Sequence, residues 1–130
     1  MKIAVIIVRT LIGLMFLFAS ITVLFHLIEA PPPPSEAVRA FNDGIAATGY
    51  FMIVLKITEL PCSLAFISGR FVPLATVVVA PIIVNIFLFH TFMDHSGLPI
   101  AIFLVAANLF LAYAYRKSYA PLFVARPAIN

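Results

Sequence analysis

The chain has 130 residues, of which 64% are hydrophobic and 10% are charged, and its mean hydropathy is +1.16. A soluble domain has about half apolar and about a quarter charged residues, so this composition excludes an ordinary soluble protein and indicates an integral membrane protein. The net charge of +3 does not indicate nucleic-acid binding, because the eight basic residues form no cluster and lie mostly at the ends of apolar segments.

The first apolar segment starts after the short basic N-terminus. Arg9 interrupts this segment, and no small-residue cleavage site follows it, so we expect a retained membrane span and not a cleaved signal peptide. Cys62 is the only cysteine, which excludes a disulfide within the chain, a CxxC redox pair and a thiolate metal cluster.

Four apolar segments have roughly the length that a helix needs to cross the hydrocarbon layer. They cover about residues 3–28, 44–68, 71–93 and 98–115. The sequence therefore predicts an all-α polytopic membrane protein, with one domain over residues 1–130 that forms an antiparallel four-helix transmembrane bundle.

The connections between these segments differ in length. The loop 29–43 contains four consecutive prolines, which we expect to form a stiff polyproline II strut, followed by a short interfacial helix with Ser35 as its cap. The connection around Gly69 and Arg70 is short and predicts an antiparallel hairpin of the second and third spans. The segment Asp-His-Ser-Gly at 94–97 makes a similarly tight third connection.

The distribution of Lys and Arg predicts the orientation in the membrane. One set of helix ends carries most of the basic residues, namely Lys2, Arg9, Arg70, Arg116, Lys117 and Arg126. The opposite loops contain only Arg39, together with the acidic residues Glu29, Glu36, Asp43 and Asp94. The positive-inside rule then places both termini in the cytoplasm and the proline-rich loop and His95 outside.

The second span carries Lys56 and Glu59 near its centre. Its ten Leu, Ile, Val and Phe residues favour insertion by about 3–6 kcal/mol, whereas the two charges oppose it by about 5–7 kcal/mol. This helix alone barely inserts, so it is expected to bury its polar groups against the other spans.

Helical spacing places Thr48, Met52, Lys56, Glu59 and Ser63 on one stripe of the second span. Counting a rise of about 1.5 Å per residue from the ends of the spans predicts that five polar residues lie close enough in depth to form one cluster. They are Arg9, Lys56, Glu59, Asn85 and Asn108. Two interpretations stay open: an ion pair that fixes the register of the bundle, or a ligand or proton site. Pro61 and Pro81 add kinks near this level, which either open a pocket or shape the packing.

Other chemistry receives less support from the sequence. His26 and His90 fall at similar depth on different spans, as bis-histidine haem ligation requires, but neither lies on the polar stripe of its helix, so haem or a metal is the less favoured interpretation. The chain has no Gly-rich phosphate loop, no HExxH motif and no serine with a base beside it, so we do not expect an enzyme.

Several segments together resemble the DoxX-like family of small bacterial four-helix membrane proteins. They are "VRTLIGLMFLFAS", "GYFMIVLKITELPCSLAFISGRFVPLA", "APIIVNIFLFHTFMDHSGLP" and "AYAYRKSYAPLF", and the resemblance covers about residues 5–123. Arg9, Gly13, Gly49 and Glu59 are the most recognisable positions. The resemblance implies the four-helix fold and a bacterial inner-membrane location. Some members are described as subunits of redox machinery, including quinone-linked thiosulfate oxidation and thiol-stress complexes, but no catalytic residue carries over.

The sequence leads us to expect one of three functions, in order of preference. The first is an accessory subunit of a larger membrane complex, such as a redox complex, without a catalytic site of its own. The second is a stand-alone protein that binds a quinone-like lipophilic molecule through Lys56, Glu59 and Asn85, and the third is a transporter of a small solute. The expected partners are the lipid bilayer and other membrane subunits or a second copy of the chain, and no nucleic acid.

Overall fold

The structure is a computed structural model that describes all 130 residues, and it contains helices and no strand. Its α-helices are α1 (Lys2–Leu24), α2 (Glu36–Ala47), α3 (Phe51–Ser68), α4 (Val72–Phe92) and α5 (Leu98–Ala114). The 3₁₀ segment η1 (His95–Gly97) joins α4 to α5, and the 3₁₀ segment η2 (Arg116–Phe123) follows α5. Four segments are long and apolar enough to cross a membrane: Lys2–Leu24, Phe51–Ser68, Val72–Phe92 and His95–Ala114. The predicted all-α fold, with four helical segments long and apolar enough to span a membrane, is thus confirmed.

Two expected spans are shorter than predicted. The first ends at Leu24 instead of residue 28, and His26 lies beyond it in the left-handed region with φ 53°. The second begins at Phe51 instead of residue 44, because Gly49 adopts φ 77° and separates α3 from the preceding helix. The Thr48 hydroxyl accepts a hydrogen bond from the Phe51 amide at 3.1 Å, which satisfies one of the free N–H groups at the start of α3.

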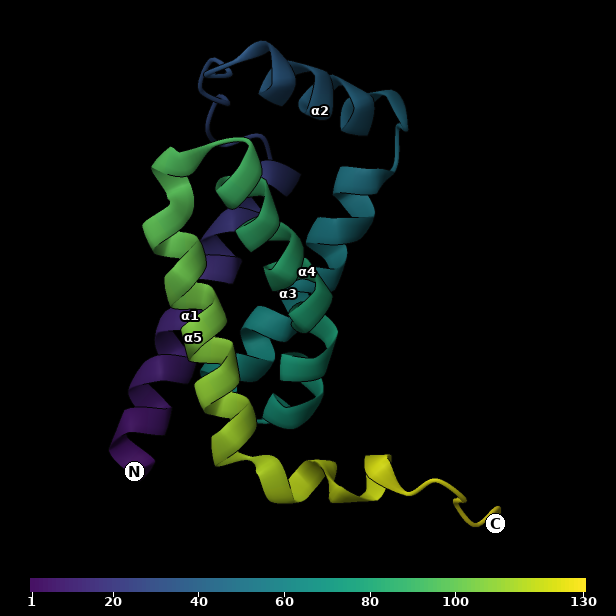
Figure 1. The fold of residues 1–130 in the computed structure, drawn as a ribbon. Helices are drawn as coiled ribbons and strands as arrows, with labels where there is room; N and C mark the ends of the chain where they lie inside the picture. Colours follow the sequence, from purple (N-terminus) through teal and green to yellow (C-terminus); the bar gives the residue numbers. More distant parts are fainter.

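The helix α2 begins in the segment predicted as an interfacial helix and continues to Ala47, into residues predicted for the second span. Its N-cap is Ser35, as predicted, and the Ser35 hydroxyl accepts a hydrogen bond from the Val38 amide at 3.2 Å. Val38 is the only buried residue of α2, and the Phe41 ring lies 5.1 Å from that of Phe89 in α4. As a result α2 lies across one end of the bundle, as Figure 1 shows.

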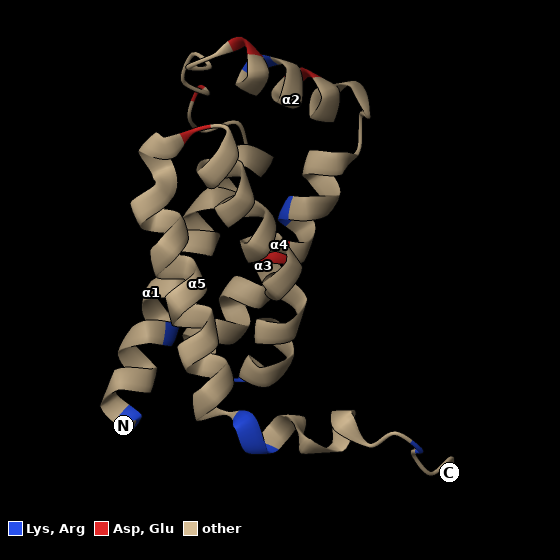
Figure 2. Ribbon diagram, in the orientation of Figure 1, with Lys and Arg blue, Asp and Glu red and all other residues tan.

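The two chain termini lie at the opposite end of the bundle, which is called the terminal end below (Figure 1). The charges are divided in the same way in Figure 2. Basic residues gather at the terminal end, apart from Arg39 in α2 and Lys56 in α3, and the acidic residues lie at the α2 end, apart from Glu59 in α3.

The bundle core lies between the four long helices, where α1 packs most extensively against α3 and α4 against α5. Gly13 permits the close approach of α1, since a Cβ atom there would lie 2.7 Å from Ile67 Cγ1 and 3.0 Å from the Ser63 carbonyl oxygen. The apolar core consists of Ile12, Phe16, Cys62, Phe66, Val72, Ala75, Val79, Ile83, Leu104, Ala107 and Leu111.

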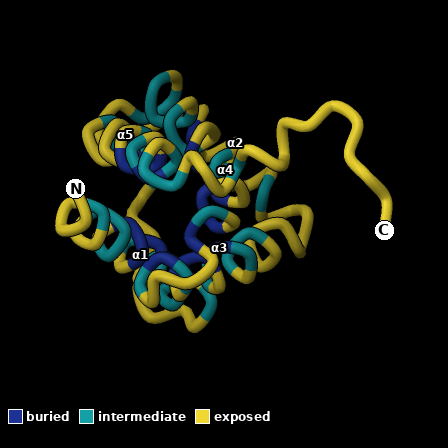
Figure 3. Tube along the Cα trace, turned by 90° about the horizontal axis from the view of Figure 1, so that it is seen from below, coloured by how far each residue is buried: buried dark blue, intermediate teal, exposed yellow.

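Most of the apolar surface of the helices faces outward. Only 19 of 130 residues are buried, and large apolar side chains such as Phe18, Leu74 and Leu109 are 60% exposed or more. Viewed along the bundle, buried residues occupy the inner sides of the helices and exposed residues the outer sides (Figure 3). Such an apolar exterior requires lipid as its solvent.

Candidate functional site: an ion pair beside a groove between α3 and α4

The two charged residues of α3 form an ion pair within the bundle. Lys56 Nζ donates to Glu59 Oε2 at 3.0 Å, and the side chains are only 12% and 2% exposed. They stand three residues apart, so successive turns of one helix bring them together. Their opposite charges neutralise one another, which reduces the free-energy cost of placing them in the membrane.

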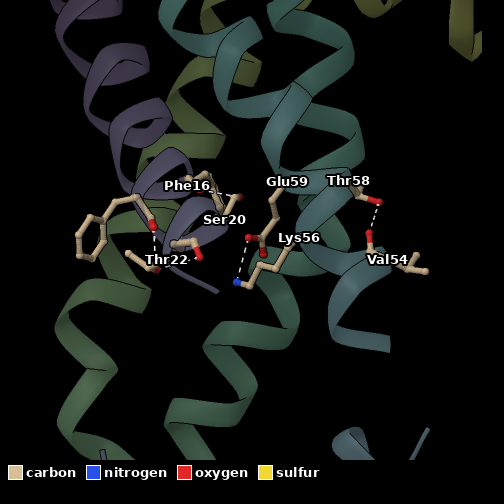
Figure 4. Close-up of polar contacts among 9 residues, drawn as sticks. Phe16, Ser20, Thr22, Val54, Lys56, Thr58 and Glu59 are labelled. Carbon is tan, nitrogen blue, oxygen red and sulfur yellow. Dashed lines mark hydrogen bonds and ion pairs between the residues drawn. The ribbon is translucent and has the colours of Figure 1, made fainter. Parts of the chain in front are cut away.

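The helix α1 covers the carboxylate side of this pair. In Figure 4 the Glu59 side chain extends from α3 toward Ser20 of α1, and Lys56 approaches it from the next turn of α3. Ser20 is fully buried and donates its hydroxyl hydrogen to the Phe16 carbonyl at 2.7 Å. Thr58 lies on the other side of α3, where its hydroxyl donates to the Val54 carbonyl (Figure 4).

A pocket of about 310 Å³ adjoins the ion pair. Lys56 and Glu59 form part of its wall on α3, and Asn85 belongs to its wall on α4. The remaining lining residues are Phe51, Leu55, Pro81, Ile82 and Ile86. The pocket therefore combines an apolar surface with three polar side chains, a composition typical of small-molecule sites.

A second pocket of about 210 Å³ continues the first toward α2. The two share Phe51, Leu55, Asn85 and Ile86, and the second also includes Asn42 of α2 and His90 of α4. Together they form a groove between α3 and α4, which is called the α3–α4 groove below. It leads from the ion pair at mid-depth to the underside of α2.

The polar groups in the groove have unused hydrogen-bonding capacity. Lys56 has three N–H donors and uses one, and its bond occupies only Oε2 of the two Glu59 carboxylate oxygens. The exposed Asn85 amide makes no hydrogen bond within the chain. Because unpaired polar groups are costly in a membrane, this arrangement is suited to a ligand that offers both acceptors and donors.

Two prolines line pockets between α3 and α4. Pro81 lies inside α4 and lines the pocket beside the ion pair, while Pro61 lies inside α3 and lines a separate apolar pocket nearer the terminal end. Each proline removes one backbone hydrogen bond of its helix and prevents regular packing of the preceding turn.

Two members of the predicted polar cluster lie apart from the ion pair, which corrects the expected arrangement. Arg9 is near the terminal end, where its Nη1 donates to the Phe66 carbonyl at 3.3 Å and its guanidinium lies against Gly69. Ser20, the residue of α1 that faces Glu59, is eleven residues further on, which is about 16 Å along the helix. Arg9 therefore does not join the Lys56–Glu59 pair.

Asn108 is also separate from the ion pair. Its Nδ2 donates to the Thr76 carbonyl at 3.3 Å, and Thr76 is nine residues from Asn85 on α4, about 13 Å along the helix. The Asn108 Oδ1 atom is buried without a hydrogen-bond partner. Tyr119 of η2 contacts Thr76 through a hydroxyl–hydroxyl hydrogen bond, a contact that no pattern in the sequence indicates.

The two histidines considered as haem or metal ligands have different surroundings. His26 is exposed in the turn after α1. His90 is half-buried in the last turn of α4, where Nδ1 donates to the Asp94 carbonyl at 2.9 Å and the ring packs on Gly97. No group of three His, Cys, Asp or Glu side chains is placed to hold a metal ion.

The sequence matches the DoxX family over residues 4–91, more than half of the chain. The chain belongs to the DoxX family. The match extends from the start of α1 almost to the end of α4, so both walls of the α3–α4 groove belong to the DoxX region, whereas Asn108 in α5 lies outside it. No curated protein and no solved structure matches the chain.

Proposed function

We propose that this DoxX protein binds a lipophilic molecule with a polar, quinone-like head group in the α3–α4 groove. The observation that carries the proposal is the pocket of about 310 Å³ in which a buried ion pair retains unused hydrogen-bonding capacity. An ion pair that only fixed helix register would be expected to have these groups covered by other side chains.

The chemistry of the lining residues defines the ligand class. Lys56 can donate to a carbonyl oxygen, Glu59 Oε1 can accept from a hydroxyl group, and Asn85 can do either. A quinone and its hydroquinone present these groups on opposite edges of a flat ring, and Phe51, Leu55 and Ile82 supply an apolar surface for the ring. A tail would extend toward α2 or into the surrounding lipid.

We further propose that the four spans form an antiparallel bundle in the bacterial inner membrane with both termini in the cytoplasm. The concentration of Lys and Arg at the terminal end supports this orientation through the positive-inside rule (Figure 2). The α3–α4 groove then lies in the outer half of the bilayer, and its entrance is under the interfacial helix α2.

The experiment compares wild type with Glu59→Gln and Lys56→Met after purification and incubation with a short-tailed benzoquinone. Native mass spectrometry is expected to show one bound quinone on the wild type and a strong reduction on both variants, whose thermal stability is measured in parallel. Thr58→Val is the matched control, because this neighbouring hydroxyl lies away from the pair and bonds only to its own helix. Folded variants that bind quinone like wild type would refute the proposal.

A second function, as an accessory subunit of a larger membrane complex, has support from the α2 end. Phe25, Leu27 and Ile28 follow α1 and are each 60% exposed or more, next to the exposed proline strut. These apolar side chains in a loop are suited to contact with another membrane subunit. Native mass spectrometry of the protein extracted gently from its membranes should show a stoichiometric partner that is lost in Phe25→Ser, and a solitary wild-type chain would argue against this role.

A further inference from the structure

A groove at the terminal end contains a cation without a counter-charge. Arg9 lines this groove of about 350 Å³ between α1, α5 and the α3–α4 turn, together with Lys2, Gly69 and Tyr115. The guanidinium is half-buried in a membrane-spanning helix and takes part in no ion pair. Its one hydrogen bond within the chain goes to the Phe66 carbonyl, so most of its five donors are free.

The protein supplies no anionic side chain that could neutralise Arg9. All acidic side chains lie at the α2 end or in the middle of α3, where Glu59 is already paired with Lys56 (Figure 2). The basic residues Lys2, Arg70, Arg116 and Lys117 increase the positive potential of the terminal end. A guanidinium stays charged at any physiological pH, so an external anion is the remaining source of neutralisation.

The position and shape of the groove indicate which anion fits. Arg9 lies about 10 Å from the start of α1, and from there its long side chain can extend to the border between head groups and acyl chains. The apolar side chains of Val5, Ile6 and Ala114 line the same groove and offer a surface for an acyl chain. Basic pockets between helices on the cytoplasmic side are typical sites for anionic lipid head groups.

We propose that this groove binds the phosphate of an anionic phospholipid, with Arg9 as its principal ligand and Lys2 as a second contact. Arg9 can contact two phosphate oxygens while it keeps its bond to the end of α3. The lipid would thereby join α1, α3 and α5 at the terminal end. This site is separate from the α3–α4 groove and does not depend on what that groove binds.

The test titrates the purified full-length protein in detergent with phosphatidylglycerol, with phosphatidylcholine and with inorganic phosphate. Native mass spectrometry should show one tightly bound phosphatidylglycerol, much weaker phosphatidylcholine binding and no displacement of the lipid by millimolar phosphate. Arg9→Gln should weaken phosphatidylglycerol binding about tenfold, since it removes a charge-assisted contact. The control is Arg126→Gln, because Arg126 is exposed in the C-terminal segment and lines no part of the groove.

A second variant tests the groove while Arg9 is retained. Ala114→Leu adds side-chain volume to the apolar wall without changing any charge, and it should also reduce phosphatidylglycerol retention. This variant decides the question if Arg9→Gln does not fold. Equal binding of the two lipids, saturation by inorganic phosphate alone, or full retention of phosphatidylglycerol in Ala114→Leu would each overturn the proposal.

Discussion

Replacing Gly13 by Val tests whether close contact between α1 and α3 holds the ion pair in place. The first added atom, Cβ, would lie 2.7 Å from Ile67 Cγ1, 3.0 Å from Phe66 Cβ and 3.0 Å from the Ser63 carbonyl oxygen. Normal carbon contacts are about 3.5–4.0 Å, so α1 must move away by several tenths of an ångström. The half-buried Ile67 side chain can rotate, but the backbone at Ser63 cannot.

Overpacking of this kind costs about 1–3 kcal/mol, and the two further methyl groups of Val place Gly13→Val near the upper value. Ala at this position gains about 1 kcal/mol in helix propensity, so Gly13→Ala should lose no more than about 2 kcal/mol. A loss of about 3 kcal/mol corresponds to a decrease in Tm of about 10 °C for a chain of this size.

The assay is thermal unfolding in detergent, with quinone retention measured on the same samples. Gly44→Ala is the control, because no atom lies within 4 Å of a Cβ atom at this position of α2, and it should leave Tm unchanged or slightly higher. Since the movement of α1 also withdraws Ser20 from Glu59, quinone binding should weaken in Gly13→Val. A Gly13→Val protein with wild-type Tm would refute the close packing of α1 on α3.

Two further predictions concern the other polar groups. Asn108→Leu should raise the free energy of unfolding by about 1 kcal/mol, because it removes a buried oxygen without a partner and loses only one long hydrogen bond. Thermal unfolding in detergent measures the effect, and a lower Tm than wild type would show that this oxygen is bonded. At the start of η1, the Ser96 hydroxyl donates to the carboxylate of Asp94, the N-cap residue, at 2.6 Å and holds the pKa of that carboxyl below its ordinary value, assisted by the Ser96 amide. The charged carboxylate therefore stabilises the loop above the ordinary pKa, and this contribution is lost as the pH falls through the lowered pKa. Ser96→Ala should raise the pKa of Asp94 in a carboxyl-carbon NMR titration, and an unchanged pKa would contradict the assignment.

The sequence was sufficient for the features that depend on local spacing. The four apolar segments have the length needed to cross the hydrocarbon layer, the Lys56–Glu59 pair follows from their separation by three residues, and Ser35 has the residue type and position of a helix N-cap. Each of the last two depends on residues within one or two helical turns. Helix ends were less accurate, because a positive φ at His26 or Gly49 is not evident from hydropathy.

The positions of Arg9 and Asn108 could not be derived from depth counting. Depth along a span says nothing about which side of the helix faces a neighbour, and an error of a few residues at a helix end shifts the level by several ångströms. For Arg9, the glycine at the end of the second span was an indication of its partner. Gly69 has the left-handed conformation of a helix C-cap, and a cation is stabilised beside the carbonyl groups that such an end leaves free.

The depth of each charged group agrees with the cost of burying it. Lys56 and Glu59, which neutralise one another, lie well inside the bundle, whereas Arg9, with no anionic partner in the chain, lies within about 10 Å of the terminal end. A side chain of arginine length can reach the head-group region from there, but it could not do so from the level of Glu59. The cost of burying charge therefore favours a neutral ligand beside the paired charges inside the membrane and a lipid phosphate beside the unpaired one at its surface.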